Sequence, residues 1–496
     1  NETRFVSDIT AQTGLNYVHH ENDFIEFNRE FLIPHMVSTE GPALAVADIN
    51  HDGLEDVFIG SSKTFHNAIF LQQPNGKFVQ TKQPLMALDS MYEDVDAQWV
   101  DVNNDGNLDL VVASGGNEFY GKDEYLLPRI YLNDGKAKFK KLQGAFNNIY
   151  VTQSCIVPFD FNGDGFIDLF IGGRVVPWEY GKMPQSYLLQ NDGTGKFVDV
   201  TQKYAKDLAN IGMVTNALWF DINKDGQKDL IVTCEWGGIY SFINNKNSFT
   251  KKVVTDKNGW WNFILPVDIN NDGNIDLIAG NLGLNSRLHA SDKEPVRLYY
   301  NDFDNNGKKE QVLTYFLSGK EIPFANKDEL TKQMPFIKKK YLYAADFANA
   351  TLEDIFSKEK LQSSQLLTAN YFSNAVLFND GKLNFNIQAL PWEAQLTQYR
   401  DATIVDANGD NLPDVLLVGN YYDNNIQMGR YDADYGTLLI NKGNGKFETK
   451  QLNGLLIKGQ VRKIKSIKIN NQPSFILAKN NDSLQIIQFK KQDILK

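Results

Sequence analysis

The sequence predicts an all-β protein, a single β-propeller of seven or eight blades over residues 1–496, with eight blades favoured. Three observations lead to this prediction. A nine-residue acidic pattern recurs, short apolar runs rich in β-branched and aromatic residues flank each copy, and the first five copies begin 53, 59, 61 and 47 residues apart. Four short strands repeated at such intervals are typical of propeller blades.

The repeated pattern is Asp-x-Asn-x-Asp-Gly-x-x-Asp. Five copies follow it closely and begin at Asp48, Asp101, Asp160, Asp221 and Asp268. Two further copies diverge. The copy at 406–414 has Asn411 in place of the glycine, and the copy at 302–310 has Asn306 and Glu310 in place of aspartates.

Each acidic loop lies between two apolar runs that we expect to be strands, as at 155–159 and 169–172 around the third copy. A further apolar strand, a turn with Asn-Gly or Gly-Lys and a last strand follow, as at 187–199, and predict a hairpin. Together these pieces form a four-stranded antiparallel unit. One such unit cannot bury both of its faces, whereas a ring of them can.

The two ends of the chain predict how the ring closes. Residues 5–10 resemble the last strand of an interior unit at 197–201, and residues 464–489 supply three strands without an acidic loop. We expect the N-terminal strand to complete the C-terminal blade, which removes two exposed sheet edges. Two capping-box patterns, at Asn326 and Thr351, predict a small helical insertion around 326–360 within the propeller domain.

The oxygen-bearing side chains of the loops predict bound calcium. Side chains at positions 1, 3, 5 and 9 and the backbone carbonyl at position 7 can supply ligands, and glycine at position 6 permits a sharp turn. Acidic turns without metal are the alternative, because Asp and Asn favour turns. The register of the carboxylates across six copies favours calcium, which would also relieve their mutual repulsion. We expect five to seven structural sites.

The predicted calcium ligands are positions 1, 3, 5, 7 and 9 of all seven copies. They are Asp48, Asn50, Asp52, Leu54, Asp56, Asp101, Asn103, Asp105, Asn107, Asp109, Asp160, Asn162, Asp164, Phe166, Asp168, Asp221, Asn223, Asp225, Gln227, Asp229, Asp268, Asn270, Asp272, Asn274, Asp276, Asp302, Asp304, Asn306, Lys308, Glu310, Asp406, Asn408, Asp410, Leu412 and Asp414. The departures at Asn306 and Asn411 set the sites at 302–310 and 406–414 apart from the other five.

These repeats resemble those of FG-GAP/VCBS-repeat proteins, which form calcium-dependent β-propellers similar to the head of integrin α-chains. Segments 19–48, 327–356 and 429–436 are similar to the C-terminal half of long bacterial surface members, which often carry an ASPIC/UnbV-type module upstream. The resemblance implies an extracytoplasmic, outer-membrane-associated protein, with or without a lipid anchor, that binds something. Such proteins can accompany outer-membrane nutrient transporters.

The far ends of the second strands predict a ligand-binding face. The acidic loop joins the first two strands of a blade, so the second strand ends on the opposite face, where small residues predict an open central mouth. Trp, Tyr and Arg are residue types that anchor protein and sugar partners. The predicted ligand-binding residues are Arg174, Trp178, Glu235, Trp236, Trp260, Trp261 and Arg287. Packing of each Trp between blades is the alternative.

Composition and motifs argue against several classes of function. Fifty basic and 61 acidic residues give a net charge of −11, which argues against nucleic acid as the partner. No apolar run reaches about 18 residues, so no transmembrane segment is expected. The start of the sequence shows no signal peptide, although a leader could have been removed. Motifs for nucleophilic, zinc-dependent or phosphate-binding chemistry are also missing from the sequence.

The sequence therefore predicts a calcium-stabilised, non-enzymatic binding module on the surface of a bacterium. Its expected partner is a protein, such as a membrane transporter complex, or a glycan. The alternative is a lectin or polysaccharide-active enzyme that uses the central mouth, where Glu179 and Glu235 could form a pair of carboxylates. A structural spacer within a longer polypeptide is a third hypothesis.

Overall fold

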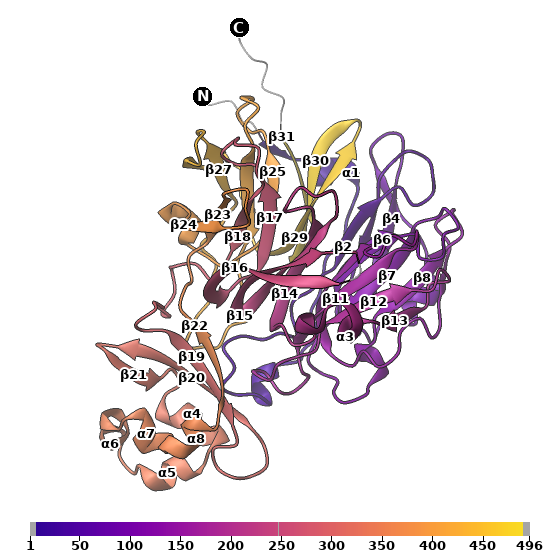
Figure 1. The fold of residues 1–496 in the computed structure, drawn as a ribbon. Coiled ribbons are helices and arrows are strands. Elements are labelled where there is room, and N and C mark those ends of the chain that lie inside the picture. The colour runs from indigo at the N-terminus through magenta and orange to yellow at the C-terminus, as the bar shows by residue number, and fades with distance from the viewer. Residues whose placement is uncertain (1–5, 247, 490–496) are drawn as a thin grey trace.

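The computed structural model describes residues 6–246 and 248–489 and confirms the all-β propeller. Its strands form eight antiparallel sheets, of which seven are the blades of a ring and one belongs to an insertion (Figure 1). The innermost strands of the seven blades contact one another in order, and the last contacts the first, so the ring is closed. The ring has seven blades, which lies within the predicted range, but the preference for eight blades is wrong, because the sheet that contains the acidic copy at 302–310 lies outside the ring.

The first four blades follow the chain without interruption. Blade 1 consists of β2 (Leu44–Ala47), β3 (Asp56–Ile59), β4 (Ala68–Gln72) and β5 (Phe78–Gln80), and blade 2 of β6 (Asp94–Val100), β7 (Asp109–Ser114), β8 (Arg129–Asn133) and β9 (Phe139–Lys141). Blade 3 consists of β10 (Thr152–Phe159), β11 (Asp168–Val175), β12 (Tyr187–Asn191) and β13 (Phe197–Asp199), and blade 4 of β14 (Met213–Phe220), β15 (Asp229–Asn244) and β16 (Phe249–Trp260).

The last three blades include one that is interrupted and one that joins both ends of the chain. Blade 5 consists of β17 (Phe263–Val267), β18 (Asp276–Gly280), β23 (Ala375–Asn379) and β24 (Phe385–Ala389), and blade 6 of β25 (Tyr399–Val405), β26 (Asp414–Gly419), β27 (Thr437–Asn441) and β28 (Phe447–Gln451). Blade 7 consists of β29 (Gln460–Ile469), β30 (Gln472–Asn480), β31 (Gln485–Phe489) and the N-terminal β1 (Val6–Asp8).

Strand β1 closes the ring as the sequence predicted. It pairs antiparallel with β31, with Val6 opposite Phe489 and Asp8 opposite Ile487. Phe5, the first residue of the predicted strand, lies outside the described residues. The strands are apolar on both faces because each sheet packs between two neighbours. Leu110, Val111 and Val112 of β7, for example, are fully buried.

An insertion between β18 and β23 is larger than the helical segment that the sequence predicted at 326–360. Its sheet has the order β21 (Lys320–Pro323), β20 (Glu310–Leu317), β19 (Val296–Asn301) and β22 (Gln365–Ala369), and its helices are α4 (Lys327–Gln333), α5 (Phe336–Lys340), α6 (Ala344–Asn349), α7 (Leu352–Phe356) and α8 (Lys358–Gln362). Helices α4 and α7 begin at the capping boxes of Asn326 and Thr351. The insertion lies at the end of the molecule remote from β31 (Figure 1).

Short helical turns lie in the connections. They are α1 (Thr10–Thr13), α2 (Pro84–Ala87), α3 (Thr201–Tyr204), and the 3-10 turns η1 (Glu26–Asn28), η2 (Glu124–Leu126), η3 (Lys206–Leu208) and η4 (Trp392–Gln395). No helix of the described ranges is long and apolar enough to cross a membrane.

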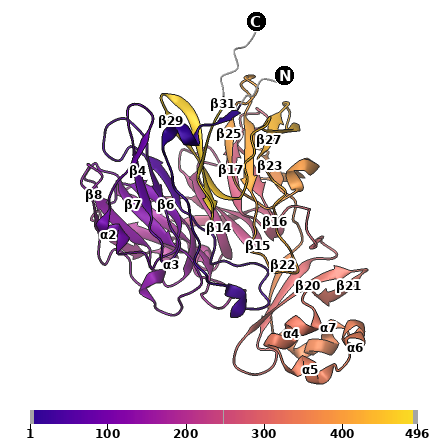
Figure 2. The same cartoon turned by 180° about the vertical axis from the view of Figure 1, so that it is seen from behind.

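The segment at 18–43, which we name the strap, leaves blade 7 and crosses one face of the ring before β2 begins. It is almost entirely buried from residue 32 to residue 43. Its indigo ribbon runs from the terminal end of the molecule to the insertion in both views (Figures 1 and 2). Ile33 and Val37 of the strap share an apolar cluster with Val175 of the ring and with Leu298 of the insertion. The strap is therefore packed between the ring and the insertion.

Candidate functional site

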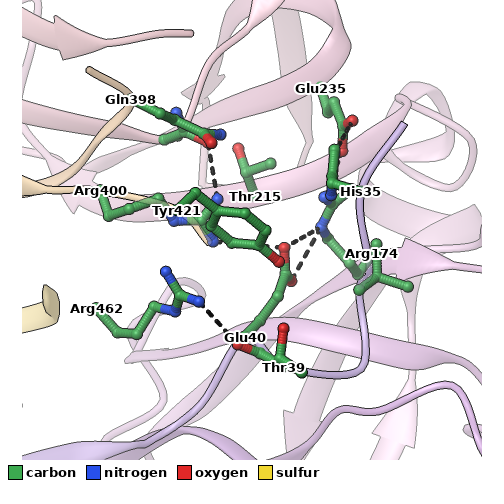
Figure 3. A network of polar contacts seen from close by, with 12 residues as sticks. His35, Thr39, Glu40, Arg174, Thr215, Glu235, Gln398, Arg400, Tyr421 and Arg462 are labelled. Carbon is green, nitrogen blue, oxygen red and sulfur yellow. Dashed lines mark hydrogen bonds and ion pairs between the residues drawn. The ribbon is translucent and has the colours of Figure 1, made fainter. Parts of the chain in front are cut away.

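Charged side chains of the strap and the ring meet at the central mouth. Glu40 of the strap pairs with Arg174 at 3.0 Å and with Arg400 at 3.4 Å. Arg174 also pairs with Glu235, whose Oε1 lies 2.7 Å from Nε2 of His35. Figure 3 shows these side chains converging from the strap and from separate blades. The mouth that the sequence predicted to be open is thus filled.

The two carboxylates of this network are held in the charged form. Burial opposes the ionisation of Glu235, but the attraction of Arg174 and His35 outweighs it and leaves the pKa of Glu235 well below its usual value. Burial and the attraction of Arg174 and Arg400 act on Glu40 in the same way, and its pKa is also lowered. The strap is therefore bound to the ring by buried ion pairs.

Most of the predicted ligand-binding residues are covered. Arg174 is 1% exposed and Glu235 is 3% exposed. Trp236 and Trp260 pack with the strap and the insertion in one apolar cluster, and Trp261 is fully buried between blades 4 and 5. The expectation that these residues are exposed at an open mouth is wrong, because the strap and the insertion cross this face. That they bind a ligand stays a prediction.

Trp178 and Arg287 are the two predicted binding residues that reach the surface. Arg287 donates to the carbonyl oxygen of Gln427 at 2.8 Å. Trp178 lies between the guanidinium of Arg29, 4.3 Å from its ring centroid, and the ring of Tyr120, stacked at 3.9 Å. Both faces of the indole are thus occupied, and Tyr120, which is 60% exposed, presents the free aromatic face.

These aromatic residues line a cleft of about 810 Å³ between the ring and the insertion. Tyr120, Tyr150, Trp178 and Glu179 form its ring side, Lys308, Lys309, Gln311 and Lys332 form its insertion side, and Arg29, Glu30 and Phe31 come from the strap. The cleft was not predicted from the sequence. The residues of its two sides lie far apart along the chain, and only the long insertion between β18 and β23 brings them together.

In the ring, the ninth residue of each acidic loop also connects the strands of its blade through hydrogen bonds to its carboxylate. In the third copy, Asp168 accepts hydrogen bonds from the backbone N–H of Phe161 at 3.3 Å and of Asn191 at 2.9 Å. The side chain of Asn191 donates to the carbonyl of Val102 in the preceding blade at 2.8 Å. Equivalent bonds to the preceding blade are made by Gln72, Asn133, Asn244 and Asn441. The signal that could have identified these bonds is an Asn or Gln at the end of the third strand of a blade.

Replacing Asn191 with alanine should lower the free energy of unfolding by about 2 kcal/mol, because two buried carbonyls lose their donor. Urea denaturation measures this change. Asn384→Ala, which removes an exposed Asn from a hairpin turn, is the matched control and should change stability by about 0.5 kcal/mol or less. Equal effects of the two substitutions would contradict a structural role for Asn191.

The donors of the loops fit a divalent cation. Burial, with repulsion from Asp164 and Asp160 adding to it, raises the pKa of Asp168 to about 7, and burial likewise raises the pKa of Glu310 to about 7. A cation would offset this cost of ionisation. Each carboxylate oxygen has two acceptor positions, so the backbone hydrogen bonds leave room for a metal.

The two divergent copies differ in their place in the fold. The copy at 302–310 joins β19 and β20 in the insertion, so it does not link strands of the ring. Asp302, Asp304 and Glu310 nevertheless bring one ligand oxygen each within 4.8 Å of one another. In the copy at 406–414, Asn411 adopts the left-handed conformation with φ of 63°, and the glycine-type turn is retained.

The fold and the repeated acidic loops define a seven-bladed β-propeller in which six blades carry the same oxygen-rich turn. The model of the FG-GAP-like repeat family matches the chain four times, at residues 48–112, 101–171, 160–232 and 221–279. The chain thus carries four FG-GAP-like repeats on a β-propeller, which confirms the FG-GAP repeats and the propeller that the resemblance implied.

Three solved structures are similar to this chain at low identity. BBS1N in complex with ARL6DN has 10% identity and a TM-score of 0.42 over 93% of this chain and 96% of its own. YCF48 bound to D1 peptide has 9% identity and a TM-score of 0.42, and the match covers 97% of this chain and 100% of the YCF48 chain. AFV00434, an ancestral GH74 enzyme, has 10% identity and a TM-score of 0.43. The match covers 92% of this chain and 48% of the AFV00434 chain. No curated protein matches the sequence.

Proposed function

We propose that this protein is a calcium-stabilised, non-enzymatic module that binds a protein partner at the bacterial cell surface, as an accessory of an outer-membrane uptake complex. The observation that carries the proposal is the cleft between the ring and the insertion, which is open, whereas the centre of the ring is filled by the strap. An FG-GAP-repeat propeller suggests a protein-interaction module. The surface location is supported by the resemblance to bacterial surface members of the family.

The state of the acidic side chains supports binding over catalysis. Glu235, which a glycosidase at the central mouth would need, is 3% exposed and is engaged by Arg174 and His35. Glu179 accepts from the hydroxyl of Tyr300 at 3.0 Å and pairs with Lys182. A catalytic acid or base needs access to substrate, which the buried Glu235 lacks. Glu179 is 36% exposed at the cleft, but the two carboxylates do not face one open site.

Calcium is supported by the repetition of one donor set. Six copies occur in the ring, each between the first two strands of a blade, and the seventh occurs beside the cleft. In the ring, the ninth residue of the loop connects the strands of its blade, so a cation there would fix the blade as well as the turn. When bound, calcium would supply positive charge and geometric constraint.

Site-specific photo-cross-linking in native membranes tests the proposed function. A photoreactive phenylalanine analogue at Tyr120 should form an adduct with an outer-membrane protein. The same analogue at Val198, which is 62% exposed on β13 and does not line the cleft, is the matched control and should form no such adduct. An absence of adducts at Tyr120, or identical adducts at both positions, would contradict the proposal. Hydrolysis of a polysaccharide by the purified protein would favour the enzymatic alternative.

A further inference from the structure

We propose that the cleft between the ring and the insertion binds an acidic, extended segment of the partner protein. Carboxylates of the segment would meet Lys308, Lys309 and Lys332, and an apolar side chain would pack on Tyr120. This inference rests on the proposed function, whose partner it specifies by its chemistry.

The insertion side of the cleft is basic on a protein that is acidic as a whole. Lys308 and Lys309 extend from the loop between β19 and β20, and Lys332 from helix α4. All three are exposed, and within the described residues none of them forms an ion pair. The chain carries a net charge of −11. Three ammonium groups on one wall of a cleft therefore select for an anionic ligand.

The carboxylates of the same cleft are already engaged. Glu30 accepts from the backbone N–H of Tyr180 and from the side-chain amide of Gln311. Glu179 is held by Tyr300 and Lys182, and Glu310 accepts from the backbone N–H of Phe303 at 2.9 Å. Each carboxylate of the lining thus accepts at least one hydrogen bond, whereas among the three ammonium groups only that of Lys309 has a partner within the described residues, the ring of Tyr300 at 5.1 Å.

This difference between the lysines and the carboxylates of the lining bears on which class of ligand the cleft binds. A neutral glycan presents hydroxyl groups, which need acceptors on the protein as well as donors. An acidic peptide presents carboxylates and backbone carbonyls, which need donors. Gln311 and Gln333 also offer acceptor oxygens without a partner in the described part of the chain, so hydrogen bonding alone does not separate the two classes. The positive charge of the three lysines favours an acidic peptide over a neutral glycan.

The aromatic side of the cleft is preorganised for an apolar group. Tyr120 stacks on Trp178, and Trp178 is fixed from behind by Arg29 and by a hydrogen bond from its Nε1 to the carbonyl of Glu118 at 3.3 Å. An aromatic surface that is already rigid loses little conformational entropy on binding. The volume of about 810 Å³ lies within the range of ligand sites, roughly 300–1,000 Å³.

Fluorescence anisotropy with defined peptides tests this inference. The probe is a labelled peptide of Glu, Ser and Phe residues, and its counterpart with Lys in place of Glu is the charge control. The protein should bind the acidic peptide, and the affinity should fall with ionic strength because exposed charges contribute. Lys308→Glu with Lys332→Glu should weaken binding by about tenfold or more.

The matched variant is Lys338→Glu with Lys339→Glu on helix α5, which makes the same change of charge on the insertion away from the cleft lining. It should leave the affinity within about twofold of the unmodified protein, because distant exposed charges are screened. Lys308 contributes only its backbone carbonyl to the predicted calcium site, so its substitution keeps that ligand.

Equal weakening by the two double variants would overturn the inference, and so would preferential binding of the basic peptide. Tighter binding of a labelled oligogalacturonate than of the acidic peptide would also overturn it in favour of an acidic glycan. If the adduct at Tyr120 forms equally in the Lys308→Glu, Lys332→Glu variant, the inference fails and the proposed function stands. If no adduct forms in the unmodified protein, the proposed function fails.

Discussion

Arg174→Met is expected to lower the free energy of unfolding by about 3–5 kcal/mol, because it leaves two buried carboxylates without their main counter-charge. Glu40 and Glu235 both pair with this guanidinium, and all three side chains are nearly inaccessible. Chemical denaturation measures the change. Arg400→Met removes a more distant and more exposed partner of Glu40 and should cost clearly less. Similar losses in the two variants would contradict a central role for Arg174.

The same network predicts how this loss depends on pH. The pKa values of Glu40 and Glu235 are lowered by folding, so the stability they contribute is present above their unfolded pKa and is lost as the pH falls below about 4. In the Arg174→Met protein the carboxylates are no longer favoured as anions. The difference in stability between the two proteins should therefore shrink as the solution is acidified, and a constant difference from neutral to acidic pH would contradict the argument. Adding Glu235→Gln to Arg174→Met should recover part of the loss.

Removal of calcium with excess EGTA is expected to lower the melting temperature by at least about 10 °C. Each site that binds only the folded state and is filled at a hundredfold excess over its dissociation constant contributes about 2.7 kcal/mol. Five or more such sites would together exceed about 10 kcal/mol, which is comparable with the whole stability of an ordinary domain. Differential scanning fluorimetry measures the shift, and added calcium should reverse it.

Metal content gives an independent measurement of the calcium sites. Asp164→Asn removes a predicted ligand from the third loop and should reduce bound calcium by one equivalent. Asp192→Asn makes the same chemical change in an exposed turn of the same blade that has no predicted metal, and it should leave the content unchanged. An unchanged melting curve in EGTA, or equal calcium content in the two variants, would contradict structural calcium.

The blades could be predicted because their signal is local. The acidic loop, the apolar runs beside it and the following hairpin lie within one short stretch of chain, and the resemblance of 5–10 to 197–201 identified the strand that closes the ring. The place of the copy at 302–310 also had a signal, since it begins 34 residues after Asp268, a distance too short for a blade.

No comparable local pattern in the sequence predicted that the central mouth would be covered. The strap has no repeat and no periodic pattern, and many of its partners are distant along the chain, as with Glu40 and Arg174, which are 134 residues apart. Whether Trp236 or Trp260 is exposed depends on what crosses the face of the ring, which the residues around each tryptophan do not encode. The cleft was missed for the same reason, because the two walls come from distant segments.

The strap also constrains the order in which the chain folds. Asn480 donates to the carbonyls of Thr39 and Gly41, and β1 pairs with β31, so residues near the start of the sequence complete their contacts with residues near its end. Contacts of such wide sequence separation form slowly. Blades 1 to 6 can assemble as the polypeptide emerges, whereas β1 and the carbonyls of Thr39 and Gly41 must wait for residues 480–489. In a nascent chain the faces of blades 1 and 6 that pack against blade 7 would therefore stay exposed to solvent until synthesis is nearly finished.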